Sequence, residues 1–101
     1  MKAVLDIGKT NVKLQLVDSS DQLCDSYSRR NMPIETAPYP HADVAGIWHW
    51  LEQTLVNYPR VHEISAMVVT THGATAALVN SKLSPADGLA LPVLDYEYAG
   101  I

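Results

Sequence analysis

The sequence has few of the features that mark disulfide-rich, membrane-spanning or nucleic-acid-binding proteins. Its single cysteine, Cys24, excludes an intrachain disulfide framework and a zinc site built from several cysteines. No apolar run reaches the ~20 residues that a transmembrane helix needs, and Asp6 brings a charge too early for a secretory signal. Seven Lys and Arg residues against eleven Asp and Glu residues give a net charge of −4. The sequence therefore shows no basic surface of the kind that binds nucleic acid or anionic membranes. We therefore expect a cytoplasmic protein with no nucleic-acid or membrane partner.

What is present is the composition of a small globular domain. The 101 residues are 48% hydrophobic and 18% charged, proportions that are typical of a folded, soluble chain. A domain of this size buries about 65% of the surface that its unfolded chain exposes, which is enough for a hydrophobic core without crosslinks. No internal repeat and no linker divides the sequence, so a single domain is expected.

Residues 3–17 have the pattern of a β-hairpin. A short apolar run over 3–7 leads into turn-forming residues, and residues 12–17 then alternate between an apolar and a mainly polar set. An alternation of two predicts a strand with one buried face. Residues 22–30 form a weaker β pattern and predict an edge strand, which completes three antiparallel strands.

A helix is predicted over residues 43–58, after the proline-rich segment 32–42. Apolar residues recur there at spacings of three and four, so one stripe of the helix is apolar. Asp43 is a favourable N-cap, and Pro59 stands just beyond the helix. The stripe predicts Trp48 in the core and leaves Trp50 half-exposed.

A further strand is predicted over residues 64–71, which are nearly all apolar or β-branched, as in a strand covered on both faces. The right-handed crossover rule places this strand parallel to the first one. Short strands are expected over 76–80 and 89–94. The predicted fold class is therefore α/β, with three antiparallel strands, a crossover helix, a parallel strand and further short strands.

The turn of the hairpin carries the residues that best fit phosphate chemistry. It is not a Walker A loop, because the first glycine of that motif is missing and a strand pattern follows Gly8-Lys9-Thr10 where the motif requires a helix. Successive turn amides can still form an anion-binding concavity, and Thr10 and Asn11 add short polar side chains. Asp6, in the apolar strand before the turn, either accepts hydrogen bonds from turn amides or faces a hydrated magnesium ion beside phosphates.

The segment Asp-Ile-Gly-Lys-Thr-Asn-Val-Lys at 6–13 resembles the first phosphate-binding hairpin of the actin-like ATPase superfamily, which includes sugar kinases, hexokinase and heat-shock chaperones. More closely, the chain resembles the N-terminal end of the FGGY carbohydrate kinases. That match runs through the predicted helix, Thr-Thr-His-Gly-Ala-Thr at 70–75 and Leu-Pro-Val-Leu-Asp-Tyr-Glu at 91–97. Type III pantothenate kinases begin with a similar hairpin, but their later segments differ. The resemblance covers nearly the whole chain and implies a ribonuclease H-like fold.

The resemblance implies a site for ATP, magnesium and a sugar or polyol. The implied nucleotide-binding residues are Asp6, Gly8, Lys9, Thr10, Asn11 and Lys13, with Asp6 also holding the metal through water. The ammonium group of Lys13 would bind phosphate as a point charge. A solvated surface lysine explains this residue equally well. His72 replaces a family glutamine near the sugar and is followed by Gly73; the alternative for His72 is a cap on a strand end. Glu97 lies near a family aspartate that binds sugar hydroxyls, but Ala99 replaces the usual arginine and leaves the substrate open.

The resemblance also implies that residues 1–101 are one part of a kinase. They correspond to a partial N-terminal domain, with a phosphate hairpin at 3–17, a helix at 43–58, and a strand and sugar-side loop at 64–98. The family's catalytic aspartate and its adenine site, in a second domain, lie outside the matched segment. No catalytic residue is therefore expected in this chain, and we expect it to be inactive when isolated.

Two further expectations follow from an incomplete domain. Such a domain exposes an apolar sheet edge or face, which favours self-association. The alternative to the sugar-kinase interpretation is a non-catalytic ligand-binding or interaction module with a degenerate hairpin, or another kinase of the superfamily such as a pantothenate kinase.

Overall fold

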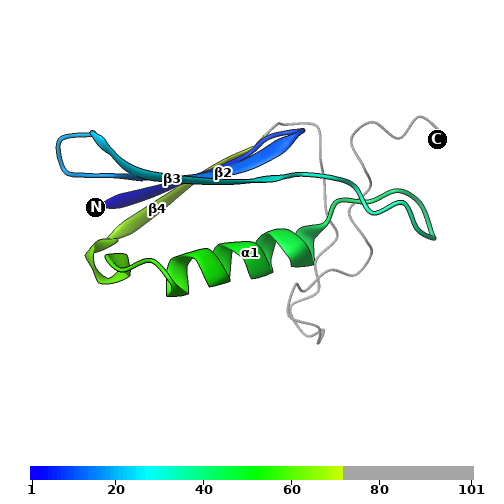
Figure 1. Ribbon diagram of the computed structural model, residues 1–101. Helices are drawn as coiled ribbons and strands as arrows, with labels where there is room; N and C mark the ends of the chain where they lie inside the picture. Colours follow the sequence, from blue (N-terminus) through cyan, green and yellow to red (C-terminus); the bar gives the residue numbers. More distant parts are fainter. Residues whose placement is uncertain (72–101) are drawn as a thin grey trace.

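The computed structural model describes residues 1–71, which form a four-stranded sheet with one long helix (Figure 1). In chain order the elements are β1 (Lys2–Ile7), β2 (Asn11–Val17), β3 (Leu23–Arg30), α1 (Val44–Val56), the short 3-10 helix η1 (Val61–Glu63) and β4 (Ala66–Thr71). The predicted α/β order of three strands, a helix and a parallel strand is confirmed. The strands expected at 76–80 and 89–94 lie outside the described residues.

The sheet has the strand order β3-β2-β1-β4. β1 and β2 are antiparallel, as are β2 and β3, whereas β4 runs parallel to β1. The chain leaves β3, crosses the sheet through α1 and returns on the other side of β1. The crossover therefore places β1, which leads into the hairpin turn, between two hydrogen-bonded neighbours.

The core lies between α1 and one face of β1 and β2 (Figure 1). The buried hydrophobic residues among those described are Ala3, Leu5, Val12, Leu14, Leu16, Leu51 and Tyr58. They alternate along both strands, so the predicted single buried face of the second strand is confirmed. Burial of a Val or Leu side chain contributes about 1.5–3 kcal/mol, and the fully buried side chains of β2 thus anchor the hairpin to the helix.

The predicted N-cap of α1 is confirmed. Asp43 Oδ1 accepts a hydrogen bond of 3.0 Å from the backbone N–H of Gly46. The other carboxylate oxygen accepts from Arg29 Nη2 at 3.2 Å, which ties the end of β3 to the start of the helix. The helix ends at Val56, two residues earlier than predicted, and Tyr58 turns back into the core.

The predicted position of Trp48 in the core is wrong, because its side chain is 54% exposed. Leu51 is the buried residue of the helix, and Ile47 and Leu55, four residues before and after it, pack against the same core. Trp48 follows Ile47 by one residue and is therefore turned about 100° around the helix axis. Trp50 is partly buried against the core, as predicted.

The prediction that the strand at 64–71 is covered on both faces is also wrong for the described part of the chain. All six residues of β4 are exposed, including Met67, Val68 and Val69. The reason is the position of β4 at the edge of the sheet, since the core formed with α1 lies over β1 and β2. Neither helix within residues 1–71 has the length and apolar character that crossing a membrane requires.

Candidate functional site

Four polar side chains form a row across the sheet on the face away from α1. Lys13 is paired with Ser28 on β3 and with Asp6 on β1, and Asp6 is paired with Thr70 on β4. Residues paired across neighbouring strands share a face of the sheet. Because Leu5 and the alternate residues of β2 face the core, this row occupies the opposite, open face.

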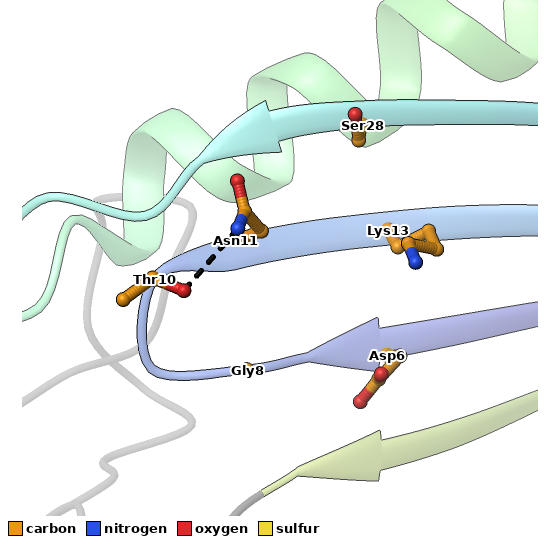
Figure 2. Close-up of a pocket in the computed structure, with 6 residues that line it drawn as sticks. All are labelled: Asp6, Gly8, Thr10, Asn11, Lys13 and Ser28. Carbon is orange, nitrogen blue, oxygen red and sulfur yellow. Dashed lines mark hydrogen bonds between the residues drawn. The ribbon is translucent and has the colours of Figure 1, made fainter.

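A pocket of about 400 Å³ lies beside the hairpin turn and is lined in part by three residues of this row (Figure 2). Its lining residues are Asp6, Gly8, Thr10, Asn11, Lys13 and Ser28. Five of the six predicted nucleotide-binding residues therefore lie together at one pocket; Lys9, exposed at the turn, is not among the lining residues. Ser28 was not predicted as a site residue. It lies at the pocket because the pairing of β3 with β2 places it opposite Lys13.

The Asp6 carboxylate is exposed on the open face rather than buried in its apolar strand. Its Oδ1 accepts a hydrogen bond of 2.9 Å from the Thr70 hydroxyl. Because it is exposed, this carboxylate does not carry the free-energy cost of burying a charge. This hydroxyl of β4, rather than an amide of the turn, is the hydrogen-bond donor to Asp6, and it leaves the other carboxylate oxygen for a further ligand.

The donors at this pocket fit a hydrated magnesium ion bound beside phosphates. Magnesium keeps several waters and takes one or two protein carboxylates, with phosphate oxygens as further ligands. Asp6 offers one carboxylate at the pocket. Among residues 1–71 no three His, Cys, Asp or Glu side chains gather into a metal-binding group. A metal held only by protein ligands therefore has no candidate in this part of the chain.

The turn between β1 and β2 is closed by its own backbone. The N–H of Gly8 donates to the carbonyl of Asn11 at 2.9 Å. A Cβ added at Gly8 would approach this same carbonyl oxygen to 3.0 Å, so the close turn favours glycine. The Asn11 side-chain amide donates to Thr10 Oγ1 at 3.2 Å (Figure 2). The Gly8 N–H is therefore engaged within the turn, and anion binding must use other donors.

Asn31, directly after β3, makes two hydrogen bonds to the turn and was not predicted as a site residue. Its side-chain Nδ2 donates to the Gly8 carbonyl at 2.7 Å, and its backbone N–H donates to the Thr10 carbonyl at 2.9 Å. Nothing in the local sequence signals this role, because the contact depends on where β3 ends relative to the hairpin.

The three predicted sugar-side residues, His72, Gly73 and Glu97, lie outside the described residues. The nucleotide-side residues at 6–13 are thus the part of the predicted site whose geometry is described. Lys13 stands in this row between a carboxylate and a hydroxyl, on the open face.

Three solved structures of carbohydrate kinases are similar to this chain. A carbohydrate kinase from Novosphingobium aromaticivorans is 33% identical, with a TM-score of 0.78, and the match covers 94% of this chain and 19% of that one. A xylulose kinase from Lactobacillus acidophilus is 18% identical, with a TM-score of 0.65 and coverage of 93% and 19%. A gluconate kinase from the same organism is 18% identical, with a TM-score of 0.65 and coverage of 92% and 19%.

The chain thus spans about a fifth of the length of these kinases. It matches no family model, and no curated protein gives a significant match. The two Lactobacillus structures, at 18% identity, support the fold alone, whereas the Novosphingobium kinase adds sequence similarity over nearly all of this chain. The chain therefore has the fold of the N-terminal, actin-like ATPase part of carbohydrate kinases and resembles that segment in sequence.

Proposed function

We propose that this chain is the N-terminal part of an ATP-dependent carbohydrate kinase of the FGGY type, and that its β1–β2 hairpin binds the nucleotide phosphates. The observation that supports this most is the pocket at the hairpin, lined by Asp6, Thr10, Asn11 and Lys13, on a chain that is 33% identical to a carbohydrate kinase.

The chemistry of the pocket suits phosphoryl transfer, which depends mainly on positioning and on stabilising charge around the phosphates. Asp6 would hold magnesium through water, and the metal would neutralise charge on the phosphate oxygens. Lys13 places an ammonium group on the same face, where it acts as a point charge. Thr10 and Asn11 provide short polar groups at the turn, with Lys9 exposed beside them.

The acceptor of the phosphoryl group is a sugar or polyol hydroxyl in this proposal. His72, Gly73 and Glu97 would form part of its binding site, with the catalytic base and the adenine site on further parts of a larger, cytoplasmic enzyme. Because the chain spans 19% of the kinases that it resembles, we expect it to bind magnesium nucleotide weakly and to show no turnover when isolated.

The test is an NMR titration of the 15N-labelled chain with magnesium ATP and magnesium pyrophosphate, with magnesium chloride alone as a reference. We expect both phosphate ligands to shift the amide signals of the hairpin, residues 6–13. Lys13→Gln should weaken binding. The matched control is Lys2→Gln, because Lys2 lies on the same face of the sheet near its far end, beside Asp21 at 3.5 Å, and its loss changes the net charge equally.

Equal binding by the two lysine variants would contradict the proposed role of the pocket. No binding of either phosphate ligand, and no binding of sugars, would favour a non-catalytic interaction module. A coupled phosphotransfer assay with a panel of ketoses and polyols tests the remaining point, since turnover by the isolated chain would contradict its expected inactivity.

A further inference from the structure

We propose that Asn31 is a positioning residue for the hairpin turn: it holds the Gly8 carbonyl on the α1 side of the sheet, away from the phosphate pocket. This inference rests on the proposed function, because it assigns Asn31 a role in binding the phosphate ligand. Asn31 itself is half-buried and is not among the residues that line the pocket. Its effect is therefore exerted through the turn.

Strand alternation places the Asn31 side chain on the α1 side. Ser28 shares the open face with Lys13, so Arg29 points to the opposite face. The hydrogen bond from Arg29 to Asp43, the N-cap of α1, agrees with this direction. The backbone bond from Asn31 to Thr10 extends the β2–β3 pairing by one step beyond β3. Asn31, two residues after Arg29, thus reaches the Gly8 carbonyl from the α1 side.

The direction of this carbonyl matters for an anion in the pocket. A carbonyl oxygen that faced the pocket would repel phosphate oxygens, whereas the hydrogen bond of 2.7 Å to Asn31 Nδ2 holds it on the other side. Because a trans peptide is planar, its N–H and C=O groups point in opposite directions. Fixing the Gly8 carbonyl therefore also fixes the orientation of the Lys9 N–H in the same peptide.

The two bonds from Asn31 act together on a turn that glycine makes easy to deform. Gly8 tolerates more backbone conformations than other residues, so the peptide after it can rotate unless a partner holds it. Asn31 bonds the carbonyls of Gly8 and Thr10, which lie on either side of Lys9. Loss of the side-chain bond leaves the Thr10 bond in place and frees only the peptide between Gly8 and Lys9.

The experiment is an NMR titration of the full chain with magnesium pyrophosphate, comparing the wild type with Asn31→Ala and Asn31→Leu. Leucine is neutral and close to asparagine in shape, but it has no donor, so this variant serves if the alanine variant folds poorly. A net hydrogen bond is worth about 0.5–1.5 kcal/mol, so we expect the dissociation constant to rise about 2- to 12-fold in both variants. The Lys9 amide signal should also shift in the absence of ligand.

Asn57→Ala is the matched control. Asn57 Nδ2 donates to the Gln53 carbonyl at 2.9 Å, which is the same kind of side-chain bond, at the far end of α1. Its loss should lower thermal stability and leave the dissociation constant unchanged. If the wild type binds and the Asn31 variants bind within twofold of it, the inference fails and the proposed function stands. If the wild type does not bind pyrophosphate, both fail.

Discussion

Replacing Gly46 by alanine should destabilise this protein, although alanine is the better helix former. Gly46 lies in the first turn of α1, and its N–H is the group that the N-cap carboxylate accepts from. A Cβ at position 46 would overlap the Asp43 carboxylate. The carboxylate would have to leave its place and would lose its bonds to both the helix N-terminus and Arg29.

The sign of the net change in stability follows from comparing three free-energy contributions. Glycine to alanine within a helix stabilises by up to about 1 kcal/mol. Loss of an N-cap costs about 1 kcal/mol, and the ion pair of Asp43 with Arg29, whose side chains are 24% and 28% exposed, adds about 0.5 kcal/mol. The net effect of Gly46→Ala is then a destabilisation of about 0.5 kcal/mol. In an Asp43→Ala background the cap is already lost, so the same substitution should stabilise by up to about 1 kcal/mol.

Urea unfolding of the four proteins of this double-mutant cycle provides the measurement. Both tryptophans, Trp48 and Trp50, lie on α1, so their fluorescence reports directly on the helix. We expect the sign of the Gly46→Ala effect to reverse between the two backgrounds, with a coupling of about 1.5 kcal/mol. A Gly46→Ala variant that is stabilised equally with and without Asp43 would refute the reasoning.

Three other predictions concern the core, the site and the sheet edge. Tyr58→Phe removes a bond of 2.7 Å to the Asp25 carboxylate and should cost about 1–3 kcal/mol in urea unfolding at neutral pH. That hydrogen bond, together with burial, raises the pKa of Tyr58 to about 12. The hydrogen bond therefore stabilises the fold fully below pH ~10, and this contribution is lost as the pH rises toward 12. The stability of the phenylalanine variant should not show this fall. Thr70→Val removes the donor to Asp6 and should weaken magnesium pyrophosphate binding, whereas Thr70→Ser should preserve it. Val69→Lys places a charge on the exposed β4 and should reduce self-association in sedimentation experiments.

Each of these predictions has a contradicting result. If the free energy of unfolding of Tyr58→Phe falls above pH ~10 as steeply as that of the wild type, the role given to the Tyr58 hydroxyl is contradicted. Equal binding by the valine and serine variants at position 70 would show that the hydroxyl does not orient Asp6. A wild-type chain that stays monomeric at high concentration would count against self-association through β4.

The order of elements could be predicted because it depends on local patterns. The alternation of residues 12–17, the spacing of three and four along the helix, and the position of Asp43 before it are each visible within a few residues. Each pattern reflects a physical constraint that acts over one strand or one helical turn. The hairpin residues were found for the same reason, since Asp6, Thr10 and Asn11 are neighbours in the sequence.

What the sequence did not reveal depends on pairing between distant segments. Ser28 and Thr70 join the row on the open face only through the register of β3 and β4, and Asn31 reaches the turn only because β3 ends beside it. Composition indicated that residues 66–71 form a strand but not which layers cover it. Trp48 shows the same limit within a helix, because the width of the buried stripe is set by the sheet beneath it.

The row across the open face also has a consequence for the order in which the site forms during synthesis. The Asp6–Thr70 bond joins residues that are 64 positions apart, whereas the hairpin closes over only a few residues. Loop closure becomes more costly with length, by about 0.6 kcal/mol for each doubling, and distant contacts form late in folding. As the chain emerges from the ribosome, the turn can thus fold long before Thr70 is available to orient the carboxylate of Asp6. The hairpin and the row across the open face thus form in two stages, and the Asp6 carboxylate is fixed only in the second.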